Sequence, residues 1–421
     1  MKRKKVQRAG IFWNMLGSGM VAANSVLMTM TVGHLFVLET VGAFTLALTT
    51  AQILYIAALF GTNDLQMTDY GERVSFGTYG IFRCTSMAAA CFLSIITVKL
   101  LRFGPAAKQY TMLLVFFMVL NAFAELFQSQ FFRRDRLDLC GKSLFFRYLL
   151  STAGFAAVLA AGGTISSACL MMIILNLAAT WRWDFRIAGS FGAGFEEWTG
   201  EKNKEGRKEK NRAVILKQLA FEALPLAASA LGYQVIINGP RYMISYFLDE
   251  GTQGVYHLLF LPAYVLNLIS QFLFKPYLHR YAETMDSDRK AFVKMLRRYL
   301  AGLTAGSFLI AGSMYVIGPE VISLFFGQNM RAYRSWQALF AFAGGVLAVN
   351  QLFYYLEVIR RRQKIIFLIY LAGGAAMLLT GIVLIPRMAI SGAWISFAAG
   401  QGTILAGFLL SWLNRTRKQS A

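Results

Sequence analysis

The chain has 421 residues, of which 57% are hydrophobic and only 15% are charged. Soluble domains usually carry about 25% charged residues, so this composition argues against a soluble enzyme and indicates lipid as the solvent. The 42 Lys and Arg outnumber the 21 Asp and Glu, a net charge of +21, and the placement of the basic residues decides whether this charge indicates nucleic-acid binding.

In chain order, twelve apolar stretches are long enough to cross the hydrocarbon core, which takes about 20 residues. They run over 11–36, 40–61, 82–101, 109–131, 145–162, 164–181, 218–247, 252–275, 298–318, 333–357, 365–385 and 389–413. We therefore predict an all-α polytopic membrane protein of about twelve transmembrane helices. The first stretch is too long for a signal-peptide core and has no convincing cleavage site, so we expect it to be retained.

The basic residues fall on alternate connections. With the N-terminus inside, the inward segments hold 35 of the 42 Lys and Arg, the outward loops hold 6, and Arg241 falls within a span. This bias follows the positive-inside rule and predicts a multi-pass protein with both termini in the cytoplasm. The excess charge therefore reflects topology, and we expect no nucleic-acid partner.

The longest polar stretch divides the chain into two six-span halves. We predict an N-terminal lobe at 1–181, a basic cytoplasmic linker at 182–217 and a C-terminal lobe at 218–421. The halves resemble one another faintly, since Gly42 and Gly254 lie 212 residues apart, each near the start of a span that follows a very short outer loop. Duplicated halves are common in transporters, with the substrate site between them.

Polar side chains inside apolar spans are costly, so each indicates a possible function. Arg241, in the seventh span, is the leading candidate to bind a phosphate or carboxylate, because a guanidinium can meet two oxygens at once. The alternative is that it snorkels to the outer surface. Further substrate-binding candidates are Asn238, Tyr242, Asn24, Asn267 and Gln271, although Asn and Gln also bridge helices in ordinary membrane packing.

The inner ends of the spans supply a second group of candidates. Asp64 and Asp69 with Arg73 and Arg83 could form an inner gate by ion pairing, and an ordinary interfacial loop is the alternative. Lys275 lies at the inner end of the eighth span. The cysteines and histidines show no metal-ligand spacing, and no nucleotide-binding P-loop, HExxH or GxSxG motif occurs. We expect no catalytic residue, metal or cofactor, apart from a coupling ion, either H⁺ or Na⁺.

One extended pattern resembles a known family. It reads Leu224-Pro225 … Asn238-Gly239-Pro240-Arg241-Tyr242 … Gly254-Val255-Tyr256 … Leu261-Pro262 … Lys275-Pro276-Tyr277. It is similar to the start of the second lobe in bacterial polysaccharide and O-antigen flippases of the multidrug/oligosaccharidyl-lipid/polysaccharide exporter (MOP) superfamily. The resemblance in span number, termini and basic linker covers essentially the whole chain.

The resemblance implies a MATE-like fold of two six-helix lobes around a cationic cavity, working by alternating access. It implies that undecaprenyl-pyrophosphate-linked oligosaccharide passes from the cytoplasmic to the outer leaflet of the bacterial inner membrane, for polysaccharide, lipopolysaccharide O-antigen or capsule assembly. The implied partners are this substrate, membrane lipid, and polysaccharide polymerase or assembly proteins.

Two alternatives remain. Cation-coupled drug efflux, in the same superfamily, usually needs acidic groups in the cavity, and buried acids are few in this sequence. A membrane glycan polymerase or ligase needs a sizeable outer loop with catalytic polar residues, and the predicted outer loops are short.

Overall fold

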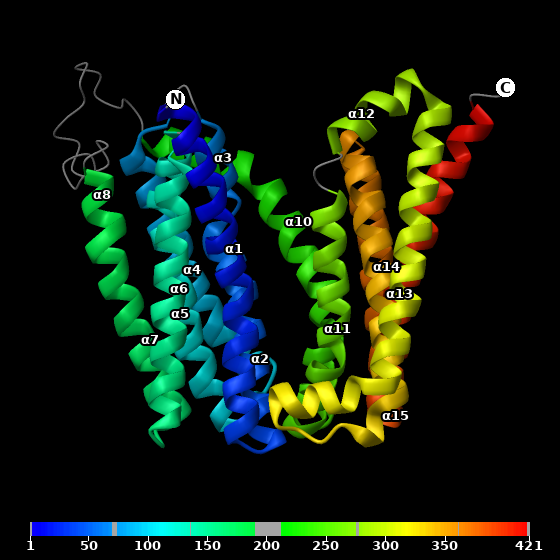
Figure 1. Cartoon of the computed structure of the whole chain (residues 1–421), viewed down its shortest axis with the longest axis horizontal. Coiled ribbons are helices and arrows are strands. Elements are labelled where there is room, and N and C mark those ends of the chain that lie inside the picture. The colour runs from blue at the N-terminus through cyan, green and yellow to red at the C-terminus, as the bar shows by residue number, and fades with distance from the viewer. Residues whose placement is uncertain are drawn as a thin grey trace. The chain divides into compact units, whose positions relative to one another are not determined.

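The computed structural model describes residues 2–69, 74–134, 136–189, 212–274, 278–360 and 362–418. Within these ranges the chain is helical, with no strand (Figure 1). The longer helices are α1 (Lys2–Leu35), α2 (Leu38–Leu59), α4 (Phe76–Leu100), α5 (Pro105–Arg133), α6 (Leu137–Ala160), α7 (Ile165–Ala179), α10 (Arg212–Phe247), α11 (Glu250–Phe274), α13 (Arg289–Phe326), α14 (Arg334–Ile359) and α15 (Gln363–Lys418). Shorter elements are α3 (Thr62–Thr68), η1 (Thr180–Phe185), α8 (Arg186–Gly189), α12 (Leu278–Ser287) and η3 (Arg331–Tyr333).

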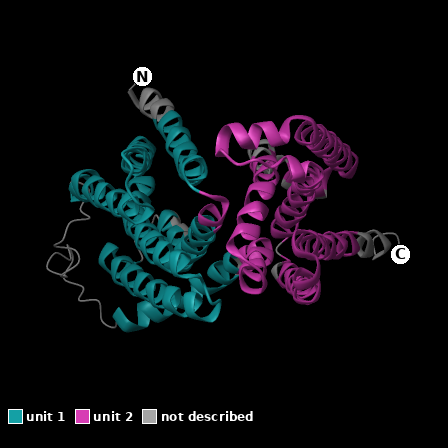
Figure 2. Ribbon diagram, turned by 90° about the horizontal axis from the view of Figure 1, so that it is seen from below, with its two compact units in different colours: residues 1–36, 43–231 teal, residues 37–42, 232–421 magenta. Residues whose placement is uncertain are grey.

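The chain divides into two compact units (Figure 2). Unit 1 comprises Met1–Phe36 and Ala43–Leu231, and unit 2 comprises Val37–Gly42 and Gly232–Ala421. The division thus falls inside α10, and the first residues of α2 belong to unit 2. Residues 190–211, most of the predicted linker, lie outside the described residues, so the lobe boundaries proposed from the sequence stay a prediction.

The number of spans agrees with the sequence. Ten helices in the described ranges are long and apolar enough to cross a membrane. One of them, Lys364–Trp412, contains two predicted spans joined at Ala389, whose φ of 48° and ψ of −120° are not helical. Its two arms fold back on each other, as the hydrogen bond from the Ser396 hydroxyl to the Met377 carbonyl at 2.7 Å shows. With the two arms counted separately and α11 included, about twelve spans result, as predicted.

The sixth span is longer than its sequence suggests. We predicted its end at residue 181, whereas helix continues from α7 through the π-helical turn η1 and α8 to Gly189. In η1, the rings of Trp181 and Phe185 stack with their centres 4.9 Å apart. The same turn buries Asp184. The polar residues at which we ended the predicted span therefore belong to the same helix, one side of which is buried.

The two glycines predicted to be equivalent are in contact within unit 2. A Cβ added to Gly254 would lie 2.7 Å from the Leu38 carbonyl oxygen and 3.1 Å from the Gly42 nitrogen. A Cβ added to Gly42 would overlap the carbonyl oxygen of Glu250. The starts of α2 and α11 thus cross backbone against backbone, which requires glycine at both positions.

Candidate functional site

Arg241 is buried within unit 2. Its side chain on α10 is only 2% exposed. The guanidinium carbon lies 5.7 Å from the centre of the Phe260 ring and 5.4 Å from that of Tyr264, both on α11. Aromatic faces stabilise a cation at such distances. Arg241 is therefore held between two helices and does not extend to the surface.

A chain of hydrogen bonds lies beside this arginine. The Asn238 amide, three residues earlier on α10, donates to the Gln234 side-chain oxygen at 2.9 Å. The Asn238 oxygen accepts a hydrogen bond from the Tyr264 hydroxyl at 3.2 Å. Tyr264 thus contacts Arg241 through its ring and Asn238 through its hydroxyl. Two predicted site residues are brought together by a tyrosine that we had not singled out.

The remaining substrate-binding candidates are distributed over both units. Asn267 is buried on α11, three residues after Tyr264, and Tyr242 is partly buried on α10. Asn24 belongs to unit 1, where its side-chain oxygen accepts a hydrogen bond from the Thr152 hydroxyl at 2.6 Å. The side chain of Gln271 lies outside the described residues.

The gate candidates take up different roles. A carboxylate oxygen of Asp69 accepts a hydrogen bond from the Val74 backbone at 3.1 Å and from the Tyr79 hydroxyl at 3.4 Å. These bonds join the end of α3 to the start of α4. Arg73, Lys275 and the side chain of Asp64 lie outside the described residues, so the proposed ion-paired gate stays a prediction.

Arg83 stands out among these candidates. The sequence placed it at the inner end of the third predicted span, and it lies in α4 with 1% exposure. None of its three guanidinium nitrogens has a hydrogen-bond partner among the described residues. Its electrostatic neighbours are Glu125 and Tyr55, whose hydroxyl donates to the Glu125 carboxylate. Buried guanidinium groups are nearly always hydrogen-bonded, so Arg83 has donors available for an anion.

Unit 1 also contains a buried ion pair that sequence analysis missed. Arg147 on α6 and Asp184 in η1 are each 1% exposed, and their charged atoms lie 3.3 Å apart. The Ser143 hydroxyl donates to Asp184 at 2.5 Å. With its amide oxygen turned toward Arg147, Gln128 accepts a hydrogen bond at 2.9 Å. This network ties the π-helical turn to α5 and α6.

We expect loss of one partner of this pair to destabilise the protein. Arg147→Ala leaves the Asp184 charge buried and uncompensated, which costs about 3–5 kcal/mol. Thermal unfolding of the purified protein in detergent would measure the loss. Arg136→Ala is the matched control, because Arg136 forms a partly exposed pair with Asp138 at 2.9 Å, and such pairs contribute about 1 kcal/mol or less. Equal effects of the two substitutions would contradict the expectation.

Solved structures with a similar fold are transporters. The lipid II flippase MurJ in an inward closed conformation matches with a TM-score of 0.65 and 11% identity, over 96% of this chain and 86% of that one. An inward-facing multidrug resistance MATE family transporter of the MOP superfamily matches with a TM-score of 0.60 and 11% identity, over 97% and 100%. The bent form of the Vibrio cholerae MATE transporter VcmN has a TM-score of 0.54 and 14% identity, over 98% and 97%.

The chain shares its fold with these transporters. The likeness extends over nearly the whole of this chain and most or all of each similar structure. No family model matches the sequence, and no curated protein sequence does either. At these identities the fold alone is shared, so the function has to be argued from the chain's own residues.

Proposed function

We propose that this MOP-fold protein flips undecaprenyl-pyrophosphate-linked oligosaccharide from the cytoplasmic to the outer leaflet of the bacterial inner membrane. The glycan serves polysaccharide, O-antigen or capsule assembly, and the protein works by alternating access. The observation that carries the proposal is the Arg83 side chain, buried with guanidinium donors that no described residue uses. A cationic group of this kind suits a substrate with a pyrophosphate.

The chemistry of the substrate accounts for the other polar groups. Each phosphoryl group of a pyrophosphate has several anionic oxygens, and a planar guanidinium can bind two of them through two parallel hydrogen bonds. Arg83 in unit 1 and Arg241 in unit 2 supply one buried guanidinium each. Asn238 and Tyr264 offer amide and hydroxyl groups suited to sugar hydroxyls. The polyprenyl chain needs no polar partner and remains in lipid.

Cation-coupled drug efflux is the second candidate. It needs buried carboxylates that are available to a cation, so the pairing of the buried acids bears on it directly. Asp184 is paired with Arg147, and Glu357 lies 3.5 Å from Arg360 and is 0% exposed. These carboxylates are neutralised by arginine and are poor sites for a cationic drug. Glu125, which accepts the Tyr55 hydroxyl, is the residue through which efflux would act.

The deciding experiment is a leaflet assay in cells that lack the protein. An impermeant glycan-modifying enzyme added from outside reports how much lipid-linked oligosaccharide has reached the outer leaflet. We expect complete intermediates to accumulate on the cytoplasmic face and a complementing copy to clear them. Repeating the assay after collapse of the H⁺ or the Na⁺ gradient identifies the coupling ion.

Two outcomes would contradict the proposal. Intermediates that reach the outer face at the normal rate would exclude a flippase. If the same cells also became sensitive to cationic drugs, and Glu125→Gln reproduced that sensitivity, efflux would be the function.

A further inference from the structure

The first turns of α13 present a row of cations on one face. Arg289, Lys290, Lys294, Arg297 and Arg298 are all exposed and follow the three- and four-residue spacing of one helix side. We call these five residues the α13 basic face. Together with Val293 and Ala301 they line a shallow hollow of about 840 Å³.

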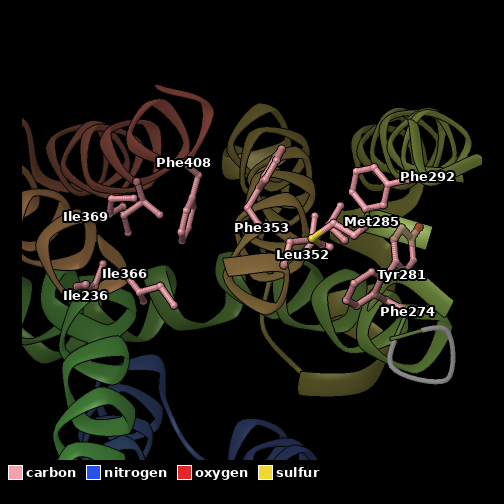
Figure 3. Close-up of a cluster of buried hydrophobic side chains, with 12 residues drawn as sticks. Ile236, Phe274, Tyr281, Met285, Phe292, Leu352, Phe353, Ile366, Ile369 and Phe408 are labelled. Carbon is pink, nitrogen blue, oxygen red and sulfur yellow. The ribbon is translucent and has the colours of Figure 1, made fainter. Parts of the chain in front are cut away.

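The opposite side of the same turns is fixed in the core of unit 2. Phe292 is 2% exposed and belongs to a buried cluster with Tyr281, Met285 and Phe274 (Figure 3). Its ring stacks on Trp412 with the ring centres 5.6 Å apart. The basic face is therefore presented by a packed helix, and the cations do not depend on a loop for their position.

No acidic residue of the described chain neutralises this face. The sequence contains no Asp or Glu from Arg289 to Pro319. None of the five cations forms an ion pair with a described residue. The exposed arginines that follow α13 differ: Arg331 in η3 lies 4.0 Å and Arg334 at the start of α14 lies 3.3 Å from Glu320. The nearest carboxylate in sequence, Asp288, caps the helix by accepting the Ala291 N–H at 2.9 Å. The basic face thus carries cations that no described carboxylate pairs with and that are available to anions from outside the chain.

The length of α13 places this charge at the membrane surface. Its 38 residues extend about 57 Å at 1.5 Å per residue, whereas the hydrocarbon core is about 30 Å thick. The apolar stretch begins near residue 298, so the turns before it reach through the headgroup layer. Phosphates of membrane lipids lie at that depth.

We propose that the α13 basic face binds the phosphate groups of anionic phospholipids in the cytoplasmic leaflet. The paired cations at 289–290 and 297–298 each meet a phosphate, and Val293 and Ala301 between and beyond them accommodate the glycerol and the start of an acyl chain. A lipid surface is favoured over a soluble anion, because the hollow combines cations with apolar contacts at headgroup depth. This binding is independent of the transported substrate.

Native mass spectrometry of the purified full-length protein tests the proposal. The protein is titrated with phosphatidylglycerol or with phosphatidylcholine, and the lipid that stays bound is counted. Each cation near an anionic surface strengthens binding about fivefold. The double substitution Arg297→Gln with Arg298→Gln should therefore weaken phosphatidylglycerol binding roughly tenfold to thirtyfold. Phosphatidylcholine binding should not change.

Matched variants separate this site from a general charge effect. Lysine at both positions should keep most of the binding. Arg331→Gln with Arg334→Gln removes two exposed charges from η3 and the start of α14, beyond the far end of α13, and should leave phosphatidylglycerol binding unchanged. Equal losses in this control, or no loss in the Arg297 and Arg298 variant, would overturn the proposal. Binding of inorganic pyrophosphate without preference for phosphatidylglycerol would also overturn it and assign the face to the transported substrate.

Discussion

Replacing Arg241 by methionine should abolish export of the lipid-linked oligosaccharide while the protein still folds and inserts. Methionine fills similar space and keeps apolar contact with Phe260 and Tyr264, so packing between α10 and α11 survives. The substrate, however, loses charge-assisted hydrogen bonds worth about 1.5–3 kcal/mol each. We therefore expect a decrease in flipping of at least about tenfold. The alanine substitution should have the same effect on export with some loss of stability.

The leaflet assay and a thermal melt together separate binding from packing. Arg241→Lys retains the charge but lacks the planar donors, so it should recover export only in part. Arg331→Met, at an arginine whose side chain is 76% exposed, is the control and should export normally. Full export by Arg241→Met would show that the arginine is a packing element, and the pyrophosphate assignment would then rest on Arg83.

Replacing Gly42 by leucine should separate the starts of α2 and α11, which are in backbone contact within unit 2. Even a Cβ at this position would overlap the Glu250 carbonyl, which belongs to backbone and cannot move aside as a side chain does. Overpacking of side chains alone costs about 1–3 kcal/mol, and overlap with backbone costs at least as much. Leucine therefore has to displace the first residues of α2 from unit 2, and because a transporter cycles between alternative arrangements of its helices, we expect transport to fall tenfold or more.

Cysteine labelling shows whether the contact between the starts of α2 and α11 opens in the Gly42 variant. Gln253 is 0% exposed beside this contact, and Gln253→Cys should react with an impermeant maleimide only when the helices separate. Labelling should increase in the Gly42→Leu background. Gly302→Leu, at a glycine with open space around it, is the control and should leave labelling and transport unchanged. Unchanged labelling in the Gly42 variant would contradict the expectation that leucine opens this contact.

Hydrophobic length was sufficient to predict the membrane-spanning helices of this protein, whereas their MATE-like fold was implied by the family resemblance. Backbone groups in lipid must be satisfied internally, so apolar stretches of the right length become helices with few alternatives. The faint similarity of the halves led us to compare Gly42 with Gly254, but it did not predict that the two glycines meet in the structure. The helices can be read from local sequence, whereas this contact depends on how the helices pack.

The site was less predictable because it depends on which side chains face each other. Asp184 was assigned to the linker and Arg147 to an inner connection, since charge near the end of an apolar stretch normally marks the membrane surface. Their pairing depends on the π-helical turn that directs Asp184 inward, and no general sequence rule predicts such a turn. The one available signal was local: a Trp-x-Trp-Asp-Phe sequence, rich in aromatic residues, continues the span. Tyr264 was missed because tyrosines are common in spans.

Most connections at the end predicted to face outward are very short. Those between α1 and α2, α4 and α5, α6 and α7, and α10 and α11 have four residues or fewer outside the helices. In the proposed orientation, the protein offers the outer compartment hardly any polypeptide to recognise. Antibodies and proteases added from that side should find few epitopes or cleavage sites. A polymerase that takes over the glycan would have to recognise the carrier lipid itself, or the helices from within the membrane.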